Sequence, residues 1–247
     1  MRRAVLIGVG VAAVVAVCAS SALASPPDFG RCVKVATGTG AFATGNCTTE
    51  GGERKFEWIA GPGPKPGFSI VASSFFLEGA VAKAKVTCVG VTGAGELTGP
   101  TTVGLTLTMT GCETSGGKCR TAGFKEGEFS LPAMTGELGV TKVGETHLKD
   151  QIGLNLSGNW GFECGGALVQ VKVTGSAIGV ISPTHGMATL RKWVFKVISK
   201  TRQSPERFVG GLPQQFEATI NGSEERQGFS LAATLTSQEK IEINTVY

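Results

Sequence analysis

Histidine and aspartate, on which most hydrolytic and metal sites depend, are scarce in this sequence. There are two His, His147 and His185, and two Asp, Asp28 and Asp150. A Ser-His-Asp triad would need one of each, and a three-His zinc site cannot be built. The motifs G-x-S-x-G and H-E-x-x-H are absent. Because both histidines lie in polar loop sequence, we expect no catalytic residues, no metal site and no cofactor.

Glutamate offers a second route to hydrolysis. Two carboxylates at a set separation beside aromatic sugar platforms cleave glycosides. Glu126 and Glu128 are predicted to share one strand face, and three further candidates for the same neighbourhood are Glu96, Glu137 and Glu163. Most Glu in an all-β chain are solvent-facing strand residues. A secreted hydrolase that uses paired Glu, together with His147 or His185, is therefore the alternative to a non-enzymatic protein.

The cysteines indicate disulfides. Seven are present, and Cys18 lies in the apolar N-terminal segment, which leaves six. An even number in an exported chain is typical of a disulfide set. A turn at Thr39-Gly40 would place Cys32 opposite Cys47 across a hairpin. The spacing predicts a structural disulfide between these two residues.

The other four cysteines give two further predicted structural disulfides. A turn at Ser115-Gly116 sets Cys112 opposite Cys119 and Glu113 opposite Lys118. Cys88 and Cys164 fall on the apolar faces of alternating segments, so a bridge between them would close a long loop. Two separate buried thiols are the alternative for this last pair. A zinc site is disfavoured, because C-x6-C is too wide for a zinc knuckle.

The first 24 residues have the three parts of a secretory signal peptide. A basic start at Arg2-Arg3 precedes an apolar run over 4–18, and small residues end at Ala24. The run would rise only ~22 Å as a helix, short of the ~30 Å hydrocarbon core. An uncleaved anchor and a lipoprotein with a modified Cys18 are the alternatives. We expect cleavage before Ser25, secretion to the medium or cell surface without a stable membrane anchor, and one domain over 25–247.

Period-2 alternation of apolar and polar residues dominates the mature chain and predicts strands. It is clearest over 105–110, 169–174, 192–197 and 240–244, with turn-forming clusters between them. Asn221-Gly222 is a strong hairpin-turn dipeptide. The only helix candidate is a turn or so over 205–209, with Ser204 as its N-cap. The fold class expected is all-β, an antiparallel sandwich or barrel-like domain with three disulfides.

The charge distribution disfavours nucleic acid as a partner. Without Arg2 and Arg3 the mature chain carries a net charge of about +2, whereas phosphate backbones call for dense Lys and Arg. Lys192 and Lys196 alternate with Trp193 and Phe195, so basic and aromatic side chains point to opposite faces of one strand. Stacking recognition requires them on one face.

Five segments together resemble a known family. They are PDFGRCVKV (27–35), KFEWIAGP (55–62), GC…GGKC (111–119), FECGG (162–166) and KIEINTV (240–246). The chain resembles, over nearly its whole mature length, a paralogous family of uncharacterised secreted proteins of soil actinobacteria. The resemblance implies export and a β-rich fold, and it transfers no functional residues.

Taken together, these patterns favour a secreted, non-enzymatic binding or structural module. Its partner is expected to be an extracellular or cell-wall ligand, whose chemistry the sequence does not specify.

Overall fold

The computed structural model describes residues 26–81, 85–199 and 201–245. The signal peptide predicted over 1–24 lies outside this part of the chain. The described residues form an all-β structure in which every strand pairing is antiparallel, and their helical content is the 3-10 turn η1 (His147–Lys149). The all-β prediction is therefore confirmed.

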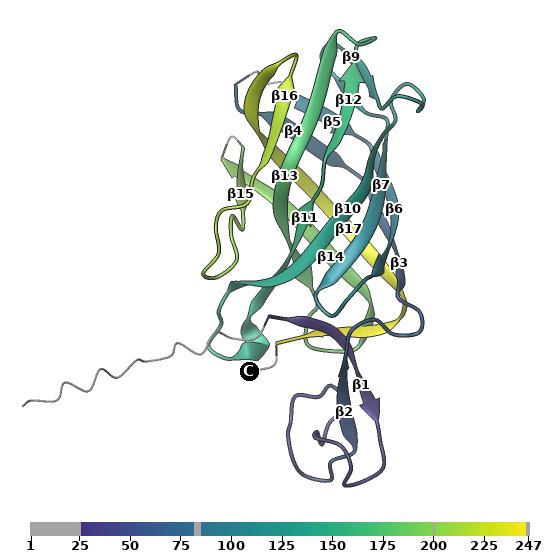
Figure 1. The fold of residues 1–247 in the computed structure, drawn as a ribbon, viewed down its shortest axis with the longest axis vertical. Helices are drawn as coiled ribbons and strands as arrows, with labels where there is room; N and C mark the ends of the chain where they lie inside the picture. Colours follow the sequence, from purple (N-terminus) through teal and green to yellow (C-terminus); the bar gives the residue numbers. More distant parts are fainter. Residues whose placement is uncertain (1–25, 82–84, 200, 246–247) are drawn as a thin grey trace, which may run out of the picture.

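Eight strands close into a ring that forms the lower body of the molecule (Figure 1). Each pairs with the next, and the last pairs with the first. In ring order they are β3 (Gly67–Ala72), β6 (Gly90–Leu97), β7 (Thr102–Thr110), β10 (Phe129–Lys142), β11 (Gln151–Ser157), β13 (Val169–Ser182), β14 (Ala188–Ser199) and β17 (Ser223–Asn244).

A second ring of mostly shorter strands closes above the first and shares two long strands with it, β13 and β17. Its other strands are β4 (Phe75–Gly79), β5 (Lys85–Cys88), β8 (Glu113–Thr114), β9 (Gly117–Arg120), β12 (Trp160–Cys164) and β16 (Phe216–Ile220). Asn221-Gly222 forms the turn from β16 to β17, as predicted. The two rings make one continuous barrel, so closure leaves few exposed sheet edges.

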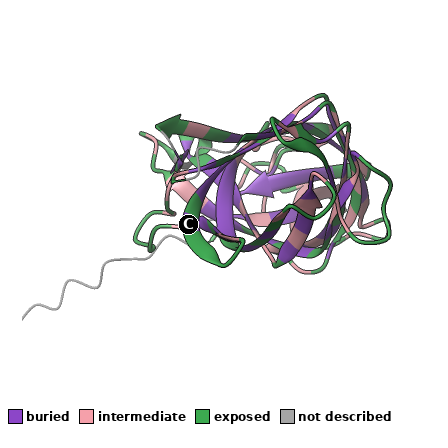
Figure 2. Ribbon diagram, turned by 90° about the horizontal axis from the view of Figure 1, so that it is seen from above, coloured by how far each residue is buried: buried purple, intermediate pink, exposed green. Residues whose placement is uncertain are grey.

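The barrel interior is filled by aromatic side chains. Phe75 and Phe229 are fully buried, with ring centroids 5.1 Å apart. Phe129 stacks on Phe162 at 4.7 Å. Figure 2 looks along the barrel and shows buried and exposed stretches distributed around its wall. Because successive strand residues point to opposite faces, each strand contributes every second side chain to this core.

Strand β14 shows the same alternation. Trp193 and Phe195 are buried, and Lys192 and Lys196 are exposed. The predicted separation of aromatic and basic faces is confirmed. β14 is paired on both sides, with β13 and β17, so the lysines decorate the outer wall of a barrel.

A small lobe below the barrel is built on β1 (Asp28–Lys34) and β2 (Phe56–Ala60) (Figure 1). β1 also pairs with the end of β17. The Cys32–Cys47 disulfide is present, as predicted. The hairpin that suggested it is wrong, because β1 pairs with β2 and the segment between them is mostly turns. The bridge ties this irregular segment to β1.

The other two predicted disulfides are wrong. The structure has Cys88–Cys112 and Cys119–Cys164 in place of Cys112–Cys119 and Cys88–Cys164. The turn at 115–116 forms as predicted, with Glu113 opposite Lys118.

The order of the strands explains why these four cysteines have partners other than the predicted ones. The Cys119 N–H donates to the Cys112 carbonyl at 2.9 Å, so these two residues do face each other across the hairpin, yet each is bridged to a neighbouring strand. On its outer sides the hairpin pairs with β5 and β12. There Cys112 meets Cys88, and Cys119 lies directly opposite Cys164.

The predicted helix over 205–209 is also wrong, because the segment is an irregular loop after β15 (Arg202–Ser204). Gln203 holds the loop start, accepting a hydrogen bond from the Phe229 N–H and donating one to its carbonyl. The Val209 N–H donates to Val140, and the Phe208 ring occupies the space beside Gly139. These tertiary contacts outweigh one helical turn, which is unstable alone.

Candidate functional site

The clearest candidate site is a cavity of about 190 Å³ inside the upper ring. Strands from every side of the upper ring, which is at the top of Figure 1, contribute residues to its lining. Most of its lining is apolar. The lining residues are Leu77, Val86, Thr114, Ser115, Gly116, Phe162, Cys164, Val169, Val171, Ile220 and Gln227.

One polar side chain, Gln227, reaches this lining from the barrel interior and is almost fully buried. Its Nε2 donates to Glu225 Oε1 at 3.0 Å. The other carboxylate oxygen, Glu225 Oε2, accepts the Val81 N–H at 2.6 Å. Glu225 and Gln227 lie two residues apart on β17, so both point inward.

Gly79 makes room for this polar pair. It lies directly opposite Gln227 in the pairing of β4 with β17. A Cβ at position 79 would come within 2.0 Å of Glu225 Oε1 and 3.2 Å of Gln227 Nε2. Because neither group could move without losing its hydrogen bond, the polar pair requires glycine at position 79.

The cavity wall is cross-linked. The strands β5, β8, β9 and β12 are two to five residues long, and such short strands have few ladder hydrogen bonds to hold them. Cys88–Cys112 and Cys119–Cys164 join them in adjacent pairs, and Cys164 itself lines the cavity. The wall is thereby fixed before a ligand arrives, which limits the ordering cost of binding.

A larger hollow of about 540 Å³ lies on the outside of the barrel, over β6, β7 and β10. Small residues leave it shallow, among them Ala94, Gly104 and Ala133. It is open to solvent, so a ligand there would remain in contact with water along much of its surface. The cavity inside the upper ring is less open than this hollow and therefore offers a ligand more burial against apolar side chains.

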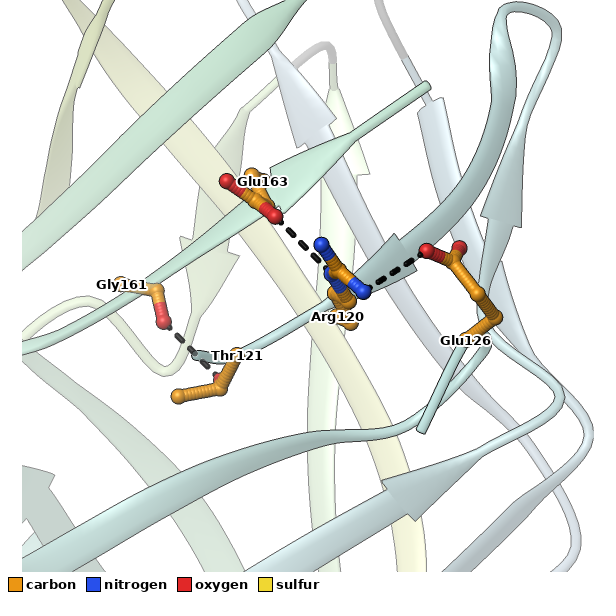
Figure 3. Close-up of polar contacts among 5 residues, drawn as sticks. All are labelled: Arg120, Thr121, Glu126, Gly161 and Glu163. Carbon is orange, nitrogen blue, oxygen red and sulfur yellow. Dashed lines mark hydrogen bonds and ion pairs between the residues drawn. The ribbon is translucent and has the colours of Figure 1, made fainter. Parts of the chain in front are cut away.

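The predicted glutamate cluster is partly assembled, but around an arginine on the outer wall (Figure 3). Arg120 Nε lies 2.9 Å from Glu163 Oε1, and Arg120 Nη1 lies 3.2 Å from Glu126 Oε1. The hydrogen bond to Glu163, followed by the charges of Glu126 and Glu163, raises the pKa of Arg120. Both carboxylates are engaged by one guanidinium and do not face each other across a cleft.

Other predicted glutamates lie elsewhere. Glu126 and Glu128 do not share a strand face, because β10 begins at Phe129 and both precede it in a loop. Glu96 and Glu137 are exposed on the outer faces of β6 and β10.

The histidines and aspartates are dispersed over several elements. Asp28 lies in β1, where burial raises its pKa. His147 begins η1, and Asp150 Oδ1 accepts the Gly144 N–H at 2.8 Å. His185 is half-buried in the loop between β13 and β14. Within the described ranges, no three His, Cys, Asp or Glu side chains are grouped to hold a metal ion.

Two buried side chains of opposite charge at the lower end of the barrel have no counterpart among the sequence predictions. Arg191 and Glu242 are both almost fully buried. Burial lowers the pKa of Arg191 to about 10 and raises the pKa of Glu242 to about 7. A hydrogen bond from the Gly186 N–H and the positive charge of Arg191 partly offset the rise in the pKa of Glu242. Arg191 also donates to the carbonyls of Ala188 and Ile241.

This pair has a structural role. The pairing of β14 with β17 shifts between Ala188, opposite Ile241, and Leu190, opposite Thr236. The Arg191 guanidinium donates to the carbonyls of Ala188 and Ile241, which face each other on one side of that irregularity, and so joins the two strands there. The geometry therefore serves to close the lower end of the barrel.

No helix among the described residues has the length and apolar character that a membrane crossing requires. Comparison of the chain with protein-family models, curated proteins and solved structures gives no match.

Proposed function

We propose that the protein is an exported, non-enzymatic binding module that encloses a small, mainly apolar ligand in the upper cavity. The observation that carries the proposal is the cavity itself: it is preformed, lined by apolar side chains from β4, β5, β12, β13 and β16, and carries one oriented amide. Concave apolar sites with few polar groups are the usual form of small-molecule sites.

The size of the cavity limits the ligand. An apolar cavity of about 150 Å³ binds benzene, and this one has about 190 Å³. A single substituted ring or a short branched aliphatic group matches that volume. Export is supported by the signal-peptide pattern over 1–24 and by the resemblance to secreted actinobacterial paralogues.

The test is calorimetric titration with 4-methylphenol, a probe of this size. We expect a dissociation constant below about 1 mM, within what so few atoms can supply. Ile220→Trp should weaken binding at least about tenfold, because the indole would occupy the cavity that Ile220 lines.

Leu190→Trp is the matched control, since Leu190 is exposed on the outer face of β14. It makes a similar change of side chain away from the cavity and should leave the affinity unchanged. Equal affinities for the wild type and Ile220→Trp, or no binding to the wild type, would contradict the proposal. Val169→Phe narrows the same cavity if Ile220→Trp does not fold.

A further inference from the structure

We infer that the ligand carries a hydrogen-bond donor, such as a hydroxyl or amino group, which it presents to Gln227 Oε1. This inference rests on the proposed function and adds the chemical class of the ligand. Its basis is the orientation of a single amide at the cavity surface.

Glu225 fixes which end of that amide faces the cavity. A carboxylate oxygen accepts hydrogen bonds, so the group 3.0 Å from Glu225 Oε1 must be the amide nitrogen of Gln227. If the amide were flipped, two oxygens would face each other at that distance. The Val81 N–H holds the other carboxylate oxygen, which restrains rotation of the Glu225 side chain.

The amide oxygen of Gln227 is therefore the atom of this side chain that has no hydrogen-bond donor among the described residues. Gln227 has 2% of its surface exposed and lines the cavity. Among the described residues, no donor hydrogen-bonds to Gln227 Oε1, whereas its nitrogen is bonded. An apolar ligand would cover this acceptor without replacing its hydrogen bond to water, and that costs free energy.

The backbone around the amide is anchored as well. Gln215 Nε2 donates to the Gln227 carbonyl at 2.7 Å and to the Phe216 carbonyl at 3.1 Å, joining β16 to β17 beside the cavity. The acceptor is therefore held in place by both its side chain and its main chain. Preorganised polar groups of this kind discriminate strongly between ligands that satisfy them and ligands that do not.

The chemistry of the lining agrees with one polar contact and an apolar remainder. Leu77, Val86, Val171 and Phe162 surround the space without polar atoms. The hydroxyl-bearing residues of the lining are Thr114, at the end of β8, and Ser115, in the β8–β9 turn, which together form the rim. A ligand with one donor would place that group at Gln227 and its apolar body against the remaining walls.

The experiment compares 4-methylphenol with p-xylene, which has a methyl group in place of the hydroxyl and nearly the same shape. The quantity measured is the ratio of their affinities in the wild type and in Gln227→Met. Removing the acceptor should shift that ratio toward p-xylene by about tenfold, the scale expected for one buried hydrogen bond. Glu225→Gln should shift it in the same direction, because the amide of Gln227 could then rotate.

Thr92→Val is the matched control, because it removes a hydroxyl group from the outer face of β6, away from the cavity, and should leave the ratio unchanged. Thr114→Val removes a polar group from the cavity lining itself. If both probes bind but Gln227→Met and Glu225→Gln leave the ratio unchanged, the donor inference is wrong and the binding function stands. A shift with Thr114→Val alone would assign the polar contact to the rim and also overturn the inference. If neither probe binds the wild type, the proposed function fails, and the inference fails with it.

Discussion

Replacing Cys119 and Cys164 together by alanine is expected to lower the free energy of unfolding by about 4 kcal/mol and to abolish probe binding in the cavity. The first effect follows from the loop of 45 residues that the bridge closes, since cross-linking a longer loop removes more entropy from the unfolded chain. The second follows from position, because Cys164 lines the cavity and the bridge holds β9 against β12. Denaturant unfolding and calorimetric titration measure the two effects.

The double variant of Cys32 and Cys47 is the control. Its bridge closes 15 residues in the lobe below the barrel, so the expected loss of stability is about 3 kcal/mol, with unchanged affinity for 4-methylphenol. Binding that survives removal of Cys119–Cys164, or that is lost equally in both variants, would show that the bridge does not maintain the cavity wall.

Arg191→Met is expected to destabilise the protein by about 3 kcal/mol at pH 8, because it removes the hydrogen bonds to the Ala188 and Ile241 carbonyls and the positive charge that favours the ionised form of the buried Glu242. The loss should be smaller at pH 5, where the buried carboxyl is protonated and neutral. Unfolding in denaturant at the two pH values measures the difference.

The wild type should show a weaker dependence of the same sign. Burial raises the pKa of Glu242 from 4.5 to about 7, so the folded protein holds this proton to higher pH than the unfolded chain. The stabilisation is complete below pH 4.5 and is lost as the pH rises through 7, by about 3 kcal/mol in all.

Glu242→Gln should remove this pH-dependent step while keeping the shape of the side chain. A wild type of constant stability between pH 5 and 8, or an Arg191→Met variant equally destabilised at both, would contradict the electrostatic coupling of Arg191 to the buried Glu242 carboxyl group.

The sequence predicts local features well because they depend on neighbouring residues. Alternation in 192–197 places Trp193 inside and Lys192 outside, and the turns at 115–116 and 221–222 follow from their residue types. The predicted helix over 205–209 is wrong because the structure of this segment depends on distant residues rather than on neighbouring ones. It competes with contacts to Gly139, Val140 and Phe229, which are remote along the chain.

The prediction of two of the three disulfides is wrong for the same reason, because the pairing depends on contacts between residues that are remote along the chain. The sequence correctly places Cys88 and Cys164 on inward faces. Which cysteine each one meets depends on the order of strands around the upper ring, where β5 and β12 flank the hairpin of β8 and β9. No local pattern specifies that order.

The polar residues of the candidate site are not among the predicted site residues, although the sequence contains a pattern that indicates them. Glu225 and Gln227 occur in phase with Phe229, Leu231, Ala233 and Leu235, so the alternation of this strand already places both polar side chains on the inward face. Arg191 is likewise in phase with Trp193 and Phe195. Polar residues on an apolar strand face indicate a polar site in the protein interior more strongly than exposed glutamates indicate a catalytic site.

Ligand binding in the upper cavity can be observed directly by methyl NMR of the wild type titrated with 4-methylphenol. We expect chemical-shift changes at Leu77, Val86, Val171 and Ile220, which line the upper cavity. The methyls of Leu190 and Val194, exposed on the outer face of β14, should not respond. Shifts confined to the outer face, or none at the cavity methyls when the probe is saturating, would contradict the proposal that this barrel encloses a small ligand.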